Sequence, residues 1–561
     1  MNWTEIKKVL DKLAIDINAI ADPHVASIQR TLLNLVEVLA EANLELQKTN
    51  QKLKDEINRL KGEQGKPDIR NQTKDKSNST GNTNHSSESY RKNHGGQKKH
   101  KLKMCKKQTI NIDRRVICKL DNDSLPDDAI FKGYEKRVLQ DLKIITDNVE
   151  FSLATYYSPL LKKTFIAQLP KGYQGEFGPG IRTLVITLYR DSGMTEPAIE
   201  RFFTTFNIKI SKSTISRMIT EDHDGFHQEK EDIINAGLKA SPYQHVDDTG
   251  CRVNGKNHYA HILCNPYFTA FFTRPQKDRL TILEILSRSE LKFKFNNDAY
   301  ELMSEFGLPS KWLTELKEIV REKIVTRHEL DDILNQFFPN PKKHATNRRV
   351  ISEASAIAYY HSSGCAIEHL MCDDAPQFNK IAKHKSLCWV HEGRHYKKLN
   401  PVFTMHRNSL DSFIEQFWNY YDKLISYEQN TSTTLAEKLS KEFDILFSTV
   451  TGYEPLDERI AMTLVKKSSL LLALTFPFLP LHNNPAESGA RVQARIRDIN
   501  LQTISGNGTK TKDTFATIVQ TARKLGVNIY QYVYDRVSKT FSMPSLASLI
   551  TERSNIGYDT T

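Results

Sequence analysis

The spacing of apolar residues near the N-terminus predicts one long helix over residues 25–63. In its second half, positions along one stripe of the helix recur at alternating intervals of four and three residues, which is the spacing of a coiled-coil seam. These positions are Leu46, Asn50, Leu53, Ile57 and Leu60. The same intervals occur earlier, offset by a stutter, at Ile28, Leu32, Leu35 and Leu39. The pattern predicts self-association through this helix, with Asn50 specifying the register; the alternative is packing against the body of the same chain.

The apolar pattern stops after this helix, and residues 64–110 are rich in Asn, Ser, Thr, Lys and Gly. A segment with so few apolar residues cannot offset the entropy lost on ordering, so we predict a disordered linker. Within it, residues 91–107 carry Lys and Arg but no acid. This basic run is either a solvated tether or a mobile arm that contacts phosphates.

Residues 111–238 are predicted to form a mainly helical domain. Two short amphipathic helices, 195–206 and 211–220, flank a turn at 207–210, which is the spacing of a helix-turn-helix. The face available for DNA would carry Lys212, Ser213, Thr214, Ser216 and Arg217. The alternative is an ordinary helical hairpin in a protein core, because pairs of helices of this size are common.

From about residue 240 the pattern changes to short strands. We expect strands at 243–247, 258–264 and 268–273, with a turn through 250–255, then a helix at 278–286 and strands at 367–372 and 387–391. Three antiparallel strands followed by a helix are the opening of a ribonuclease H-like sheet. The predicted fold is therefore an α/β core at 239–540, a mixed five-stranded sheet with helices, carrying helical inserts at about 288–360 and 403–470. Residues 485–540 should be helical with a break at 505–511, and 541–561 should form a tail.

Charge and cysteine content narrow the classes of partner. The chain has 561 residues, with 79 Lys and Arg against 67 Asp and Glu, and a pI near 9.1. This surplus favours a polyanion such as nucleic acid. Seven scattered cysteines form no C-x-x-C pair, so we expect a reducing cytoplasm and no disulfide framework. No apolar run is long enough for a membrane span, and no signal-peptide pattern opens the chain.

Three acids stand where a phosphodiester-cutting site would need them. Cleavage needs a positioned nucleophile, a stabilised leaving oxygen and neutralised charge, which two Mg²⁺ ions supply when hard carboxylate ligands hold them. Asp247 lies in or at the end of the first strand, Asp373 ends the fourth, and Glu487 opens a helix. Spacing alone does not exclude a simpler interpretation, because Asp-Asp pairs after apolar runs also form turns and helix caps.

The segments around these acids resemble the insertion sequence 66 family of transposases. Four segments carry the resemblance in the family's order: His-Val-Asp-Asp-Thr-Gly-Cys-Arg-Val-Asn-Gly-Lys at 245–256, Met-Cys-Asp-Asp-Ala-Pro-Gln-Phe at 371–378, Leu-Cys-Trp-Val-His-Glu-Gly-Arg-His at 387–395, and Asn-Asn-Pro-Ala-Glu at 483–487. Residues 515–526 also resemble the family's C-terminal segment. Two departures are visible: Asp248 stands where the family usually has Glu, and Cys105 and Cys118 are too few for its zinc module.

The resemblance implies a DDE-type enzyme that binds the terminal repeats of a mobile DNA element, cuts the strand and transfers it to target DNA. It implies that Asp247, Asp373 and Glu487 are catalytic and hold two Mg²⁺ ions, with Mn²⁺ as a substitute. Asp248 and Asp374 would then be supporting residues. The alternatives are an inactive DNA-binding protein or repressor derived from such an enzyme, and a scaffold that assembles through the coiled coil.

Several neighbours of the three acids have two interpretations each. His391 is either a packed core histidine or a phosphate-contacting group, and Trp389 is either core or a base-stacking platform. For Asn483 and Asn484 the simple interpretation is that they cap a helix. The arginines nearby either pair with acids or contact phosphates, and we predict phosphate contacts. These arginines are Arg394, Arg491 and Arg495.

Overall fold

The computed structural model describes residues 22–60, 112–118, 133–142, 144–288, 290–364 and 366–558. The predicted linker at 64–110 and its basic run lie outside these ranges. The chain divides into a larger unit, made of Met1–Lys74, Pro170–Arg201 and Ile210–Thr561, and a smaller unit, made of Asp75–Leu169 and Phe202–Lys209.

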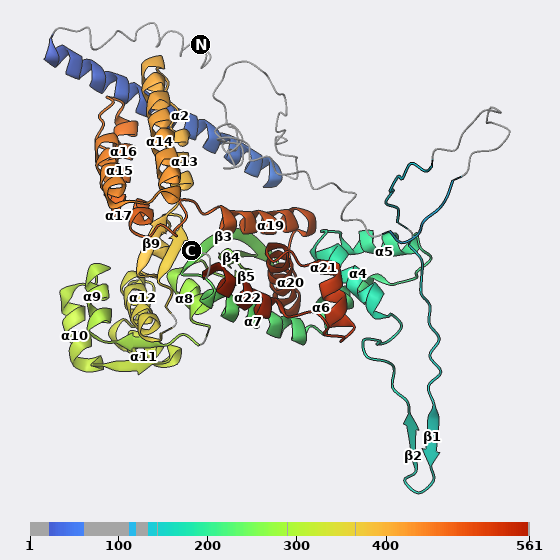
Figure 1. Ribbon diagram of the computed structural model, residues 1–561. Helices are drawn as coiled ribbons and strands as arrows, with labels where there is room; N and C mark the ends of the chain where they lie inside the picture. The colour runs from blue at the N-terminus through green and yellow to red at the C-terminus, as the bar shows by residue number, and fades with distance from the viewer. Residues whose placement is uncertain are drawn as a thin grey trace, which may run out of the picture. The chain divides into compact units, whose positions relative to one another are not determined.

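A mixed five-stranded sheet forms the centre of the larger unit (Figure 1). Its strands are β3 (Tyr243–Val253), β4 (Lys256–Cys264), β5 (Thr269–Arg274), β8 (His369–Cys372) and β9 (His384–Leu387). They lie in the order β5-β4-β3-β8-β9; the first three are antiparallel, whereas β8 runs parallel to both β3 and β9. This topology confirms the predicted mixed sheet and is consistent with a ribonuclease H-like core.

The first hairpin of the sheet is longer than its sequence suggested. Gly250 pairs with Tyr259 inside the β3–β4 ladder, so the turn predicted through 250–255 was too long. The chain reverses only at Asn254 and Gly255, whose φ values of 47° and 73° suit the tight turn that right-twisted strands prefer. The extra residues of β3 therefore extend past Asp247.

Helices cover both faces of the sheet. On one face, α19 (Asn484–Asn500) packs on β3 and β4, whereas α20 (Gly506–Lys524) packs along β5, an edge strand of the sheet. Ile262 of β4 lies in the apolar cluster beneath these helices, whereas its neighbour Leu263 belongs to the cluster that includes Ile282 of α8 (Arg279–Ser287). The alternation of β4 side chains thus builds two apolar layers, one on each face.

The first helical insert lies between α8 and β8. It contains β6 (Phe293–Phe295), α9 (Asn297–Glu305), α10 (Ser310–Val320), β7 (Lys323–Val325), α11 (Arg327–Phe337) and α12 (Ala345–Ser362). β6 and β7 pair as a small antiparallel sheet of their own. The insert expected at about 288–360 is therefore present, with α12 packed on α8.

The second insert follows β9 and has its own aromatic core. It contains α13 (Trp389–Lys398), α14 (Thr404–Gln429), α15 (Thr433–Leu446), α16 (Glu454–Val465), α17 (Lys467–Leu470) and α18 (Leu472–Thr475). The strand predicted at 387–391 was wrong, because β9 ends at Leu387 and Trp389 already begins α13. Trp389, Gly393 and Tyr396 recur at helical spacing on the buried side, which explains the helix. His391 and Arg394 therefore lie on a helix.

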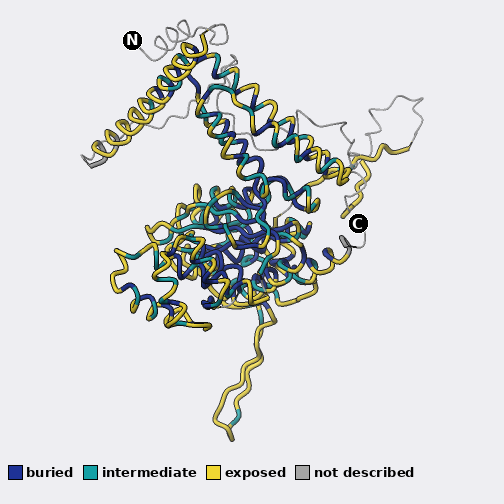
Figure 2. The backbone as a smooth tube through the Cα atoms, turned by 90° about the vertical axis from the view of Figure 1, so that its left-hand side faces the viewer, coloured by how far each residue is buried: buried dark blue, intermediate teal, exposed yellow. Residues whose placement is uncertain are grey.

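The segment before the sheet is less helical than predicted. In the smaller unit, β1 (Thr155–Ser158) and β2 (Lys163–Ile166) form an antiparallel hairpin whose residues are almost all exposed (Figure 2). Their aromatic and β-branched residues favour strands. Between this hairpin and β3 the chain forms the helices α4 (Pro179–Arg190), α5 (Glu196–Thr204), α6 (Lys212–Thr220) and α7 (Asp224–Lys239).

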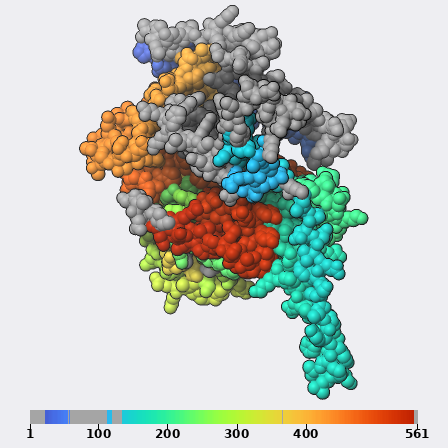
Figure 3. All heavy atoms as spheres, turned by 45° about the vertical axis from the view of Figure 1, so that its right-hand side comes forward, coloured from blue at the N-terminus to red at the C-terminus, as the bar shows by residue number. Residues whose placement is uncertain are grey.

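The C-terminal segment folds back onto the core. The expected tail instead contains α22 (Leu546–Tyr558), which packs on α7 through the buried Leu546 and Ile550. It follows α21 (Ile529–Val537), and Figure 3 shows this last part of the chain as one contiguous red surface. The predicted break at 505–511 is shorter, because Ser505 caps α20 and the helix begins at Gly506.

The long N-terminal helix is present as α2 (Pro23–Leu60). One face packs on the second insert, where buried Glu37 accepts hydrogen bonds from the backbone N–H groups of Val402 and Phe403 at 2.7–3.0 Å. Packing against the body of the same chain, one of the two alternatives, is thus observed for this face. None of the helices in the described ranges combines the length and hydropathy that crossing a bilayer would require.

Candidate active site

Asp247 lies in β3, and Asp373 directly follows the neighbouring parallel strand β8. His245 of β3 is in register with Met371 of β8, so Asp247 and Asp373 each come two residues later along the same direction. Each aspartate turns one oxygen toward a local backbone N–H group. Asp248 donates to Oδ1 of Asp247 at 2.8 Å, and Ala375 donates to Oδ1 of Asp373 at 3.1 Å.

Glu487 reaches the same strands from α19, which packs against β3. The link is the fully buried Asn483, whose Nδ2 donates to the carbonyl of Val246 at 2.8 Å. Its Oδ1 accepts from Nδ1 of His245 at 2.9 Å. Asn483 occupies the N-cap position but makes no capping bond with its side chain, so the capping interpretation was wrong for this residue. Its amide instead fixes the start of the glutamate's helix against the strand of Asp247.

The carboxylates share one electrostatic environment. Burial, followed by the negative charges of Asp373, Asp248 and Glu487, raises the pKa of Asp247 to about 7, although the backbone bond from Asp248 opposes this rise. The charges of Asp373 and Glu487 act on Asp247, so both acids lie in its surroundings, but the described groups whose ligand atoms all lie within 4.8 Å of one another do not include these three acids together. An acid surrounded in this way by negative charge is stabilised by a bound cation.

Three side chains surround the carboxylate of Glu487. Arg394 donates from Nη2 to Oε2 at 2.8 Å, and Nη2 of Arg491 lies 3.6 Å from the same oxygen. Nδ1 of His391 lies 3.6 Å from Oε1, and its Nε2 accepts from Nη1 of Arg394 at 3.0 Å. Burial is the main reason that the pKa of His391 is lowered, so its ring is neutral at pH 7.

The oxygens that remain fit divalent cations. Oε1 of Glu487 is buried and has no hydrogen-bond partner among the described residues, which is unusual for a carboxylate oxygen. Ligand atoms of Cys388, His391 and Glu487 lie within 4.8 Å of one another. Together with the two aspartates the site offers mainly hard oxygen donors, which suit Mg²⁺ or Mn²⁺.

The second acid of each Asp-Asp pair is engaged elsewhere. Asp248 accepts from Nε2 of Gln377 at 3.1 Å. Asp374 lies 2.8 Å from Nζ of Lys466 and 3.2 Å from Nζ of Lys385. Burial raises the pKa of Asp374, but the two lysines outweigh it and lower the pKa overall. These contacts leave Asp247 and Asp373 as the better candidates for metal ligands.

The candidate DNA-contacting residues occupy two helices besides α13. On α6, Lys212, Ser213 and Arg217 are exposed and Thr214 is half-buried; the helix is capped by Ser211, whose Oγ accepts from the N–H of Thr214 at 3.2 Å. The two helices of the predicted helix-turn-helix therefore exist, and DNA binding by α6 stays a prediction.

The other candidates lie on α13 and α19, the helices of Arg394 and Glu487. Arg491 and Arg495 are exposed on α19, and Arg394 is partly exposed while it pairs with Glu487. Trp389 is fully buried and its Nε1 donates to the carbonyl of Leu470 at 2.9 Å, which confirms the core interpretation and excludes base stacking.

Comparison with known proteins agrees with this geometry. A family model described as "Transposase IS66 family" matches residues 174–306 and 348–511. An uncharacterized protein of Sinorhizobium fredii, y4jO, is 28% identical over 309 residues, which cover 54% of this chain and 94% of that protein. The matched ranges include all five strands of the central sheet and the helix that carries Glu487. Because the family model covers more than half of the chain, this chain belongs to the IS66 family of transposases.

Proposed function

We propose that this chain is a catalytically active transposase, which cuts DNA at the ends of a mobile element and joins the freed strand to target DNA. Asp247, Asp373 and Glu487 are its catalytic carboxylates and hold two Mg²⁺ ions, with Mn²⁺ as a substitute. The observation that carries the proposal is geometric: β3 and β8 run in register toward Asp247 and Asp373, and Asn483 fixes the start of the helix of Glu487 against β3.

The residues of the site would have different roles in the reaction. When bound, the metal pair activates water and later a 3′-hydroxyl for in-line attack, and it neutralises charge at the phosphorus. The charges of both other acids act on Asp247, which is our candidate for the ligand that the two ions would share. Arg394 holds Oε2 of Glu487, which leaves the unpartnered Oε1 available as a ligand.

The DNA would be held by positive charge around this centre. The exposed Arg491 and Arg495 follow Glu487 at four-residue intervals, so they line the same side of α19 and are placed to contact phosphates. His391 and Arg394 would add contacts from α13. We assign recognition of the terminal repeats to α6, through Lys212 and its neighbours.

Self-association is assigned to the exposed side of α2. The residues that pack on the chain's own body are Ala26, Leu33, Glu37 and Ala40. At about 100° per residue, the predicted seam lies on the opposite side of the helix. Its members remain exposed: Ile28, Leu32, Leu35, Leu39, Leu46, Leu53 and Ile57. One helix can therefore pack on its own chain and pair with a second copy at the same time.

The test is Mg²⁺-dependent cleavage of DNA that carries the element end. Asp247→Asn, Asp373→Asn and Glu487→Gln should each reduce cleavage to below about one thousandth, because each removes a ligand charge that the transition state needs. End binding, measured by gel shift, should persist. Asp498→Asn is the matched control, since this exposed acid lies on the same helix as Glu487.

Two outcomes would contradict the proposal. Cleavage that survives in any of the three variants would remove that residue from the catalytic set. A wild-type chain that binds the ends but cuts nothing in Mg²⁺ or Mn²⁺ would instead indicate a DNA-binding protein or repressor.

A further inference from the structure

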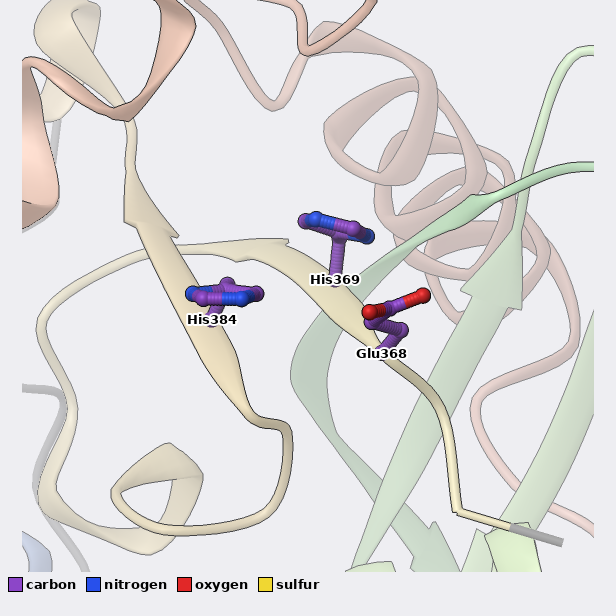
Figure 4. Close-up of side chains that lie close together, drawn as sticks. All are labelled: Glu368, His369 and His384. Atoms are coloured by element: carbon purple, nitrogen blue, oxygen red, sulfur yellow. The ribbon is translucent and has the colours of Figure 1, made fainter. Parts of the chain in front are cut away.

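A second group of possible metal ligands lies at the opposite ends of the strands that lead to the active site. His369 begins β8 and His384 begins β9, and the two residues are paired in the parallel ladder. Their rings stack with centroids 4.9 Å apart and planes 21° apart, and Glu368 lies beside them (Figure 4). One ligand atom from each residue lies within 4.8 Å of the others.

The hydrogen bond made by Nδ1 of His369 leaves the other ring nitrogen, Nε2, available to bind a metal ion. Nδ1 lies 3.2 Å from the carbonyl oxygen of Pro242, and because a carbonyl only accepts, Nδ1 carries the hydrogen. Nε2 is then left with its lone pair. The residue is only 3% exposed, and Nε2 has no hydrogen-bond partner among the described residues. A histidine that donates from one nitrogen to a carbonyl and leaves the other free matches the usual arrangement of metal-bound imidazole.

No described side chain pairs with Nε2 of His369, but the group of three residues can be reached from solvent. The ring of Phe476 lies 4.6 Å from that of His369 and 4.8 Å from that of His384, and Phe478 lies 5.1 Å from His369. These rings form an apolar wall on one side. Glu368 is exposed and His384 is half-buried, so an ion can reach the group from solvent.

We propose that Glu368, His369 and His384 bind a transition-metal dication of the Zn²⁺ class. Two imidazoles and one carboxylate suit Zn²⁺, Co²⁺ or Ni²⁺, whereas Mg²⁺ prefers sites made of oxygen donors. The site is distinct from the catalytic centre. His369 precedes Asp373 by four residues of extended chain, which is about 13 Å at roughly 3.3 Å per residue.

Binding requires a small closure of the three side chains. Ligand atoms around a tetrahedral ion with bonds of about 2.0–2.1 Å are separated by about 3.4 Å, so atoms now up to 4.8 Å apart must approach one another. Glu368 can move because it is exposed and only weakly paired, with Nζ of Lys383 at 3.8 Å. The bound ion would tie the start of β8 to that of β9, the four-residue edge strand.

The proposal is tested by equilibrium dialysis of the full-length chain against Zn²⁺ alone, without DNA. Wild type should bind one tight equivalent that Glu368→Gln/His384→Gln loses, with the affinity falling at least about 10-fold. Both substitutions are at accessible positions, and circular dichroism should confirm the fold. The control His258→Gln replaces another half-buried histidine of the sheet and should retain the tight equivalent.

A second pair of variants separates this site from the catalytic centre. In His391→Gln/Glu487→Gln, which removes the ligands near Arg394, the tight Zn²⁺ equivalent should persist and Zn²⁺ should still raise the melting temperature. The inference is overturned if Glu368→Gln/His384→Gln binds Zn²⁺ as tightly as wild type. It is also overturned if the equivalent disappears only with His391 and Glu487.

Discussion

A buried amide connects two parts of the candidate active site, α19 and β3. Asn483 uses its Nδ2 on the carbonyl of Val246 and its Oδ1 on His245, and both bonds lie next to Asp247 in sequence. Burial lowers the pKa of His245 to about 3, so this ring stays neutral and keeps its bond to the amide at any ordinary pH. The position of Glu487 relative to Asp247 therefore depends in part on a side chain to which we assign no catalytic role.

Replacing this amide should impair cleavage without weakening DNA binding. In Asn483→Asp the side chain can no longer donate to Val246, so the start of α19 shifts and Glu487 loses its placement. Because misplacement by about 1 Å can reduce a rate about 100-fold, we expect kcat to fall 10- to 100-fold. Single-turnover cleavage and gel shift measure the two effects separately, with Asn500→Ala, at the far end of the helix, as control. An unchanged kcat would show that the amide does not position Glu487.

A second side chain makes stability depend on pH. Glu229 of α7 is buried, and burial raises its pKa to about 7 although Arg536 opposes the rise. The hydroxyl of Tyr532 donates to its carboxylate. Since the folded pKa lies above the ordinary value of 4.5, the folded state holds the proton more tightly. The stabilisation is complete below about pH 4.5 and is lost as pH rises to about 7.

Glu229→Gln should remove this dependence. The free energy of unfolding of wild type, relative to that of the variant, should fall by about 3 kcal/mol between pH 4.5 and pH 8, at 1.36 kcal/mol for each unit of pKa. Urea unfolding at the two pH values measures it, and the exposed Glu552→Gln serves as control. Equal pH profiles for wild type and Glu229→Gln would refute the assignment.

Helix α20 closes the open edge of the central sheet. The N–H groups of Thr269 and Phe271 in β5 donate to Oγ1 of Thr521 and Thr517 at 3.2 and 3.1 Å, and that of Thr273 donates to Asp513. Two residues of strand rise about 6.6 Å and one helical step of four residues rises about 6.0 Å, so the two series match. Side chains of a helix thus replace the missing neighbouring strand and protect the edge.

Thr517→Val tests how much this edge contact contributes to the stability of the fold. Valine keeps the shape of threonine but leaves the buried N–H of Phe271 without an acceptor, so the variant should lose about 1–3 kcal/mol of stability. Urea unfolding gives the loss, and hydrogen exchange at Phe271 should be faster. The exposed Thr551→Val is the control. A stability equal to wild type would mean that the strand edge does not need the helix.

At the scale of the whole molecule, the long helix α2 has one packed side and one exposed side. Glu37 and its neighbours fix α2 to the second insert, and the apolar seam on the other side stays exposed. Such a row of exposed apolar residues marks an interaction site. A second copy is the partner that the seam indicates, since its spacing is that of a coiled coil.

Placing charge on the seam should separate the copies without unfolding them. Leu46→Lys/Leu53→Lys puts two ammonium groups into the predicted interface, so we expect the oligomer to dissociate to monomers in light-scattering chromatography. Lys52→Ala, also exposed on α2, should leave the mass unchanged. If the double variant keeps the mass of wild type, the chain associates through another surface or does not associate.

Features that depend on residues close together in the sequence could be predicted from the pattern of apolar and polar positions. The seam of α2, the strands around Asp247 and Asp373 and the helix that opens near Glu487 follow from local periodicity, and the order of the motifs carried the family. The end of β9 was missed because residues 387–390 form a short apolar run that suits either a strand or a helix. Packing of Trp389 and Tyr396 within the second insert favours the helix.

Contacts between distant residues were decided by the tertiary structure alone. Asn483 and His245 are 238 positions apart, and Arg394 and Glu487 are 93 apart. No local pattern encodes which of two asparagines turns toward a strand, or that two histidines beginning neighbouring strands come to stack. Periodicity fixes which side of an element is apolar, whereas a polar side chain finds its partner only when separate elements have packed together.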